Sequence, residues 1–361
     1  MRILFVNDGI LAYASKTREA VGGAERQQWY LAQALAQKGW QVVVGVRETL
    51  GRDERRTING VEFAGIGDGP FLARWGRFLT NERPDWWYWR GATHAYGPMV
   101  AISRLAGVGN VFAVAFDSDV EPRRALSRRP AYWPLYTWGL SWTDRIVVQH
   151  GGQLAALPSR WAEKARLVPS MAGAPASVKA HRCRKNHVAW IGMLRQTKRP
   201  DLLVEVARRL PAIQFVVCGG ATPHRSPVGY GDRVAEELRT LPNVTFLGQV
   251  DPDTALDVVA DAALLLSTSD EEGFPNTFLE AWVRGTPVVS LSVDPGDVVR
   301  RLGLGSVSGG LDRLTVDIPA LLASPDRRDE ISARAREHVV RTHGQDAVVA
   351  AFESALEGVA A

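Results

Sequence analysis

The feature that most constrains this chain is the regular alternation of short β-branched runs with longer stretches of helical periodicity. Strands are predicted at ten places: residues 3–6, 42–46, 86–89, 111–116, 146–148, 188–191, 213–218, 244–247, 262–266 and 288–290. Strands that alternate with helices form parallel sheets whose crossover helices cover both faces. The spacing of Leu203, Val206, Ala207 and Leu210, for example, predicts a helix that begins at Pro200. The pattern therefore predicts an α/β protein with doubly wound, Rossmann-like parallel sheets.

Length and local composition predict two domains. The chain has 361 residues, 46% of them apolar, which is enough for two ordinary cores. Apolar periodicity stops over residues 171–184, where proline, alanine, glycine and basic residues dominate. We therefore expect an N-terminal domain over residues 1–170, a linker over 171–184 and a C-terminal domain over 185–344. The remaining segment, 345–361, contains a last periodic helix that is free to pack on either domain, including back on the first.

Cysteine content and charge exclude several classes of protein. Cys183 and Cys218 are too few for a disulfide framework or a four-cysteine zinc site, which favours a reducing cytoplasm. A net charge of only +4 argues against a nucleic-acid partner. The apolar run from Ile3 to Val6 is too short for a signal peptide, and no run of about 18 apolar residues is present. We expect a cytoplasmic protein, which can still attach peripherally to the inner face of the cell membrane.

Ligands of open parallel sheets bind beyond the carboxyl ends of the strands, so the residues that follow each predicted strand are candidates for a site. In the first such segment, Gly22 and Gly23 precede a helix that begins near Glu25. A glycine pair at a helix start lets backbone amides approach an anion, although a flexible turn explains the pair equally well. The segment is not a dinucleotide-binding fingerprint, because the G-x-G-x-x-G spacing is absent.

The second segment, Gly192 to Arg199, follows the strand at 188–191 and contains Arg195 and Lys198. Basic residues at the carboxyl end of a strand suit a diphosphate. One charge pair at 4 Å contributes about 4 kcal/mol at an effective dielectric constant near 20. A solvated loop is the alternative interpretation of these charges.

The third segment, residues 267–280, leads from a buried strand through a polar loop into a helix that begins near Asn276. Glu272 lies in the loop, and Glu280 lies about one turn inside the helix. Both carboxylates can therefore face one crevice beside the positive start of the helix. Surface acids that compensate the helix dipole are the alternative.

The run from Glu272 to Glu280, EGFPNTFLE, resembles the E-x7-E signature of the retaining glycosyltransferases of family 4, which have the GT-B architecture. Three further segments match the same family in the same order along the chain: Gly22-Gly23-Ala24-Glu25, Lys198-Arg199-Pro200 and Gly285-Thr286-Pro287-Val288-Val289. The resemblance implies two Rossmann-like domains that face a central cleft. It also implies that a sugar moves from a nucleotide-diphosphate-sugar donor, such as a UDP- or GDP-sugar, to a saccharide acceptor with retention of anomeric configuration.

The same resemblance implies roles on the donor side. Lys198 and Arg195 would hold the diphosphate, Glu280 would accept hydrogen bonds from the ribose, and Glu272 would contact the donor sugar. Backbone approach to the donor is expected from a set of small and loop residues: Gly22, Gly23, Gly192, Gly219, Gly220, Gly273, Phe274, Pro275, Asn276 and Thr277. Met193 stands where many members have arginine, so Arg195 is expected to substitute for it.

A second departure concerns catalysis. Many members have a histidine at the end of the fourth strand, where this chain has Asp117 and Asp119. Either carboxylate would then orient the acceptor hydroxyl or stabilise positive charge at the anomeric carbon. The D-x-D pattern also suits a metal ion, but it belongs to a single-domain architecture in which the E-x7-E run has no place. We therefore expect no metal and no other cofactor. His94 and His150 lack metal-ligand spacing and are interpreted as ordinary loop residues.

Aromatic residues are concentrated in the N-terminal half, where ten of the twelve tryptophans lie, including Trp86, Trp87 and Trp89. Four arginines precede an aromatic run: Arg123, Arg124, Arg128 and Arg129 lie before Tyr132, Trp133, Tyr136 and Trp138. Two interpretations stay open, an ordinary core beneath a solvated surface and a patch that faces an anionic membrane. The second would suit a lipid-linked saccharide acceptor in the assembly of polysaccharides or glycolipids.

Other functions remain as alternatives. A doubly wound sheet also serves nicotinamide oxidoreductases, but the glycine fingerprint of that class is absent. An epimerase or hydrolase of the same architecture, or a non-catalytic module that binds nucleotide-sugars, would need the same donor site. Turnover of donor with acceptor distinguishes these from a transferase.

Overall fold

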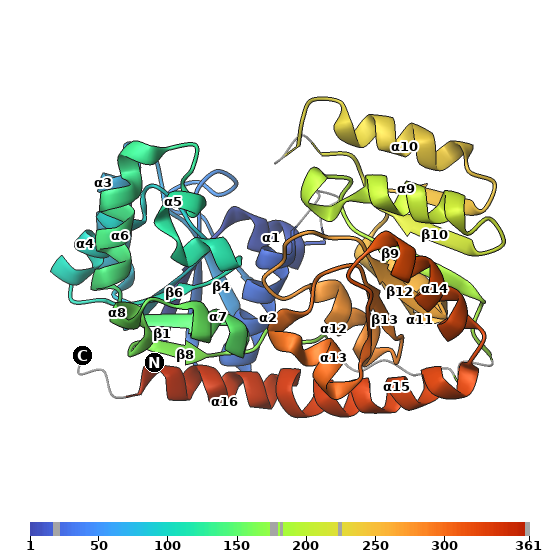
Figure 1. Ribbon diagram of the computed structural model, residues 1–361. Coiled ribbons are helices and arrows are strands. Elements are labelled where there is room, and N and C mark those ends of the chain that lie inside the picture. The colour runs from blue at the N-terminus through green and yellow to red at the C-terminus, as the bar shows by residue number, and fades with distance from the viewer. Residues whose placement is uncertain (17–21, 174–179, 181–182, 223–225, 358–361) are drawn as a thin grey trace. The chain divides into compact units, whose positions relative to one another are not determined.

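The computed structural model describes residues 1–16, 22–173, 180, 183–222 and 226–357, and the chain divides into two compact units. One unit comprises Met1–Met171 and Gln345–Ala361, and the other comprises Ala172–Gly344. Each unit contains one sheet with helices on both faces (Figure 1). The predicted class, α/β with two doubly wound parallel sheets, is confirmed. Within the predicted linker, residues 174–179 and 181–182 lie outside the described residues.

The N-terminal unit is built on an eight-stranded sheet in the order β3-β4-β2-β1-β5-β6-β7-β8. Its strands are β1 (Arg2–Val6), β2 (Gln41–Val46), β3 (Arg55–Ile58), β4 (Val61–Gly65), β5 (Trp86–Arg90), β6 (Gly109–Ala113), β7 (Arg145–Val148) and β8 (Ala165–Leu167). All neighbours are parallel except β3 and β4. Ile3 and Phe5 enter the core on one face, and Leu4 and Val6 enter the core on the other. Burial on both faces explains the continuous apolar strands of the sequence.

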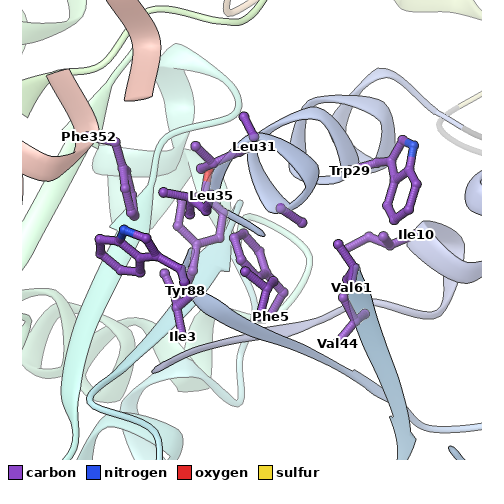
Figure 2. Packing of buried hydrophobic residues seen from close by; sticks show 14 of the residues in the cluster. Ile3, Phe5, Ile10, Trp29, Leu31, Leu35, Val44, Val61, Tyr88 and Phe352 are labelled. Carbon is purple, nitrogen blue, oxygen red and sulfur yellow. The ribbon is translucent and has the colours of Figure 1, made fainter. Parts of the chain in front are cut away.

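Helices of this unit cover both faces of the sheet. They are α1 (Asp8–Ala14), α2 (Gly23–Gln37), α3 (Phe71–Glu82), α4 (Tyr96–Leu105), α5 (Pro122–Ala125), α6 (Trp133–Trp142), α7 (Gly151–Ala156), α8 (Ser159–Ala162) and α16 (Gln345–Leu356). The last helix, α16, packs on this unit through Phe352, whose ring centroid lies 6.1 Å from that of Tyr88. Figure 2 shows Phe352 in the same cluster as Ile3, Leu35 and Tyr88. The C-terminal end of the chain therefore completes the N-terminal core.

The C-terminal unit has a six-stranded, fully parallel sheet in the order β11-β10-β9-β12-β13-β14. Its strands are β9 (His187–Ile191), β10 (Gln214–Cys218), β11 (Val244–Gly248), β12 (Leu264–Ser267), β13 (Val288–Ser290) and β14 (Gly305–Val307). Its helices are α9 (Pro200–Arg209), α10 (Tyr230–Thr240), α11 (Pro252–Asp261), α12 (Asn276–Val283), α13 (Val298–Leu302), α14 (Leu311–Leu322) and α15 (Pro325–His338). A π-helical turn, Val339–His343, follows α15.

In both sheets the strand order reverses next to the first strand of the unit, between β1 and β5 and between β9 and β12. Crossover helices leave toward opposite faces at such a reversal, so a crevice forms beyond the carboxyl ends of the two strands. Each unit therefore has a crevice where a ligand is expected. The glycine pair, the basic segment and the acidic segment come after β1, β9 and β12, whereas Asp117 and Asp119 come after β6.

Gly219 allows the loop after β10 to lie against the loop after β9. A Cβ atom built on Gly219 would lie 1.8 Å from the carbonyl oxygen of Gly192, and the Gly219 amide donates to the Gly248 carbonyl at 2.7 Å. Because the obstacle is backbone, no side-chain rotation relieves it. We predict that Gly219→Ala lowers the free energy of unfolding by about 1–3 kcal/mol in urea denaturation.

The control for this variant is Gly51→Ala, whose added Cβ would meet nothing within 4 Å. It should change the free energy of unfolding by less than about 0.5 kcal/mol. Equal stability of the two variants would contradict the packing role of Gly219.

Candidate active site

The parallel pairing of β9 with β12 brings two of the predicted segments together. Val188 pairs with Leu264 and Ala189 with Leu265, so the loops that follow the two strands begin side by side. The Asp270 amide donates to the Thr197 carbonyl at 3.1 Å, which joins the two loops through their backbones.

Thr268 makes a second link between these loops. Its hydroxyl donates to the Lys198 carbonyl at 2.8 Å and accepts from the Trp190 indole at 3.0 Å. Thr268 is fully buried, and Trp190 is nearly so. The loop that carries Lys198 is therefore held on a buried, hydrogen-bonded support.

Lys198 and Glu272 form a direct ion pair across these loops. The Lys198 side chain is 17% exposed and the Glu272 side chain is 10% exposed, so a ligand can reach both groups. The surrounding protein limits the screening of their charges by water. The lysine predicted to hold a diphosphate and the glutamate predicted to contact a sugar thus lie within one contact of each other.

Two arginines flank Lys198 and differ in how they are held. Arg195 and Lys198 lie at the two ends of a short 3-10 helix, Gln196–Lys198, and the Lys198 amide donates to the Arg195 carbonyl at 2.9 Å. Arg199, in a left-handed conformation, pairs with Asp201 at 2.8 Å and with Asp270 at 3.4 Å. Burial alone would raise the pKa of Asp201, but hydrogen bonds from Arg199 and Tyr230 hold it below its ordinary value. Arg199 is therefore committed to carboxylates of the protein.

Helix α12 begins where the sequence predicts, at Asn276, after the buried residues Gly273, Phe274 and Pro275. The amides at its start have no partners within the helix and carry partial positive charge, which favours an anion. Glu280, one turn inside, is only 9% exposed. Such burial is not that of a solvated surface acid, so dipole compensation at the surface does not explain Glu280.

The glycines predicted to approach the donor have packing reasons of their own. The Gly192 amide donates to the Cys218 carbonyl at 3.0 Å, and a Cβ atom on Gly220 would lie 2.8 Å from Oε1 of Gln249. In the N-terminal unit, Gly22 is the N-cap of α2 and Gly23 is its first residue. Residues 17–21, which precede this pair, lie outside the described residues.

The two aspartates of the D-x-D pattern lie after β6 in different environments. Asp119 is 3% exposed, and its Oδ2 accepts from the amides of Ala115 at 2.7 Å and Phe116 at 2.9 Å. Asp117 is half exposed, and its Oδ1 accepts from the Gln153 amide group at 2.9 Å. The structure therefore directs Asp119 toward its own backbone and leaves Asp117 accessible to a ligand.

The sequence interpretation missed two neighbours of Asp117, namely His150 and Gln153. The sequence predicts an ordinary loop residue at His150, but the structure makes it the N-cap of α7, and its Nε2 lies 3.7 Å from Oδ1 of Asp117. The spacing of His150 and Gln153 could have predicted this contact, because a capping side chain three residues before a glutamine is typical of a helix start. No group of three His, Cys, Asp or Glu side chains in the described ranges is arranged to hold a metal ion.

The structure divides the aromatic and basic residues of the proposed patch into two sets. Trp86, Trp87 and Tyr136 are buried, and the Tyr136 hydroxyl donates to the Asp119 carbonyl at 2.8 Å, so these three belong to the core. Exposed residues between positions 123 and 142 include Arg123, Arg124, Arg128, Arg129, Tyr132, Leu135 and Trp142. Trp138 stacks on Trp142 with ring centroids 4.7 Å apart. Among the residues that the structure places, no helix is long and apolar enough to cross a membrane.

Sequence comparison finds a match to a known family within the C-terminal unit. Residues 185–318 match the family described as glycosyl transferases group 1. The chain is 31% identical over 181 residues to D-inositol 3-phosphate glycosyltransferase of Mycolicibacterium paratuberculosis. The aligned region covers 48% of this chain and 41% of that protein. The same enzyme of Mycolicibacterium smegmatis is 28% identical over 207 residues, which covers 52% of this chain and 45% of the relative. The match thus spans less than half the length of these relatives.

Solved structures resemble the whole chain. Sucrose-phosphate synthase of Thermosynechococcus elongatus has a TM-score of 0.78 at 18% identity, with 98% of each chain covered. Anabaena HepE in complex with UDP-glucose has a TM-score of 0.74 at 16% identity, with 99% of this chain and all of that chain covered. Taken with the family match, these similarities confirm the resemblance to the glycosyltransferases, while membership of family 4 stays a prediction. The chain therefore has the GT-B fold, and residues 185–318 of its C-terminal unit are similar to the group 1 glycosyl transferases.

Proposed function

We propose that this chain is a retaining glycosyltransferase that transfers a sugar from a nucleotide-diphosphate-sugar to a saccharide acceptor. The observation that carries the proposal is the contact of Lys198 with Glu272 beyond the carboxyl ends of β9 and β12. This contact lies where an open parallel sheet binds its ligand, and within the residues that match group 1 glycosyl transferases. Anabaena HepE, whose structure is similar, has been solved in complex with UDP and with UDP-glucose, which favours a uridine nucleotide as the donor.

The charges of the site suit departure of a nucleotide diphosphate. In the proposed reaction the bond between the anomeric carbon and the leaving phosphate oxygen breaks, and a bond to the acceptor oxygen forms on the same face. The acceptor proton goes to the leaving phosphate oxygen. Lys198, Arg195 and the first amides of α12 stabilise the negative charge that grows on the diphosphate. Glu272 contacts hydroxyls of the transferred sugar, and Glu280 binds the ribose.

We predict that Lys198→Ala lowers kcat/KM for donor by two to three orders of magnitude and leaves the fold intact. Loss of one preorganised charge costs about 3–4 kcal/mol at the transition state. The assay measures transfer from UDP-sugars to saccharide acceptors, after a thermal-shift panel of UDP, GDP, ADP and TDP has identified the nucleotide.

Lys185→Ala removes the same type of side chain from the same unit, where Lys185 is 74% exposed and pairs with Asp261. This control should keep the activity of the wild type. A Lys198→Ala enzyme as active as this control would contradict the diphosphate assignment. Donor cleavage without transfer would favour a hydrolase, and binding without turnover would favour a binding module.

Metal independence is part of the proposal. In the proposal, Lys198, Arg195 and backbone amides supply the positive charge for the diphosphate. Asp119 accepts hydrogen bonds from two backbone amides, so it does not point toward a metal ion shared with Asp117. Transfer measured with excess EDTA should therefore equal transfer measured with Mg²⁺. Activity that depends fully on a divalent ion would contradict this part of the proposal.

We further propose that the acceptor is lipid-linked and that the N-terminal unit attaches reversibly to an anionic membrane. The patch comprises the four exposed arginines Arg123, Arg124, Arg128 and Arg129 together with the exposed ring of Tyr132, which packs on His94 beside Arg129. Each arginine near an anionic surface contributes about 1 kcal/mol, and aromatic rings favour the headgroup level. A role in polysaccharide or glycolipid assembly would follow from such an acceptor.

Flotation with anionic and neutral vesicles tests this attachment. The wild type should float with anionic vesicles at low salt and dissociate at high salt, and replacing the four arginines of the patch by serine should abolish flotation. As a control for net charge, a second variant replaces four exposed arginines of the C-terminal unit: Arg208, Arg239, Arg327 and Arg336. Equal flotation of both variants, or no preference for anionic vesicles, would contradict the membrane patch.

A further inference from the structure

Asp117 lies in a small side-chain network at the carboxyl ends of β6 and β7. These strands are parallel neighbours, with Phe112 paired with Ile146 and Ala113 paired with Val147. The chain after β6 therefore meets the chain after β7, where His150 begins helix α7.

Gln153 fixes one oxygen of Asp117. The residue is 2% exposed, and its Oε1 accepts from the backbone amide of Gln149 at 2.8 Å. Since a backbone N–H can only donate, the oxygen of the Gln153 amide must face Gln149 and the nitrogen must face Asp117. Nε2 of Gln153 accordingly donates to Oδ1 of Asp117 at 2.9 Å.

His150 approaches the same oxygen. Its Nδ1 accepts from the Gln153 backbone amide at 3.4 Å, so in the neutral ring the proton is on Nε2. Nε2 lies 3.7 Å from Oδ1 of Asp117, and the His150 side chain is 11% exposed. Gln153 thus donates to Oδ1 and the His150 ring lies beside the same oxygen, just beyond hydrogen-bond distance, while Oδ2 of Asp117 has no hydrogen bond within the described part of the chain.

The groups around Asp117 favour its ionised form. Burial alone would raise the pKa of Asp117, but the adjacent His150 ring, the hydrogen bond from Gln153 and the charge of Arg124 hold it below its ordinary value. The other carboxylate of the segment, Asp119, is turned toward the amides of Ala115 and Phe116. Asp117 is therefore a half-exposed carboxylate with one oxygen anchored and the other available.

We infer that Gln153 and His150 are positioning residues, which hold Asp117 so that its Oδ2 accepts a hydrogen bond from a hydroxyl of the acceptor sugar. The inference rests on the proposed transferase function and adds to it the N-terminal group that meets the acceptor. Asp117 binds and orients the hydroxyl, whose proton leaves with the phosphate as described above.

Two variants remove the positioning in different ways. Gln153→Glu keeps an oxygen for the Gln149 amide but turns a second carboxylate toward Asp117. His150→Ser keeps an oxygen that can cap α7 and removes the Nε2 group. Because His150 is closer to the surface than Gln153, the serine variant keeps the test possible if Gln153→Glu fails to fold.

The first measurement is the pKa of Asp117, followed by carboxyl ¹³C NMR and assigned with Asp117→Asn. Both variants should raise this pKa above that of the wild type, because each removes a group that stabilises the carboxylate. The measurement needs no turnover. An unchanged pKa in both variants would overturn the positioning role whether or not the protein transfers sugar.

The second measurement is transfer kinetics. Each variant should raise the KM for acceptor about 10-fold with an unchanged KM for donor, and the acid limb of kcat/KM should move to higher pH. In an Asp117→Asn background the same substitutions should have no further effect, because they act through Asp117. A raised pKa without any change in acceptor kinetics would overturn the acceptor contact. A wild type inactive with every donor and acceptor would instead contradict the proposed function.

Discussion

The site of the C-terminal unit depends on the parallel pairing of β9 with β12. This pairing sets the reversal of strand order, and it starts the two loops at adjacent points. The contacts between the loop after β9 and the loop after β12 follow from this pairing. They include the hydrogen bond between Asp270 and Thr197 and the ion pair of Lys198 with Glu272. Residues 74 positions apart in the chain meet for this reason. In the N-terminal unit, the parallel pairing of β6 with β7 likewise brings Asp117 next to Gln153.

The ion pair also defines the state of the site before donor binds. Lys198 already has an anionic partner, so a diphosphate that enters must compete with Glu272 or share the lysine with it. In the proposed complex the diphosphate pairs with Lys198, and the sugar hydroxyls donate hydrogen bonds to Glu272. Neither charge is then left without a partner. Removing water from a charged group costs free energy, and a nearby opposite charge offsets part of that cost. Because each of the two charges keeps a partner, this cost is smaller than for an isolated lysine in the same place.

The architecture and the donor segments could be predicted from the sequence, because buried parallel strands read as apolar runs and the E-x7-E spacing is local. Helices α9 and α12 begin at the predicted residues, and α16 lies within the predicted segment 345–361. Strands β3, β4, β8 and β14 were missed. The side chains of β3 are mostly exposed, so it lacks an apolar pattern, and β8 and β14 have three residues each. The network of Asp117 was also missed, because it depends on the register between two strands. The burial of Trp87 and Tyr136 could not be predicted either, because it depends on tertiary packing.

The central claim is that Lys198 meets the diphosphate of the donor in the C-terminal unit. Calorimetric titration of the full chain with UDP and with uridine tests it most directly, because the two ligands differ only in the diphosphate. The account predicts that the wild type binds UDP at least 100-fold more tightly than uridine, and that Lys198→Ala removes most of this difference while uridine binding is unchanged. An equal preference for UDP in the wild type and in Lys198→Ala would contradict the account.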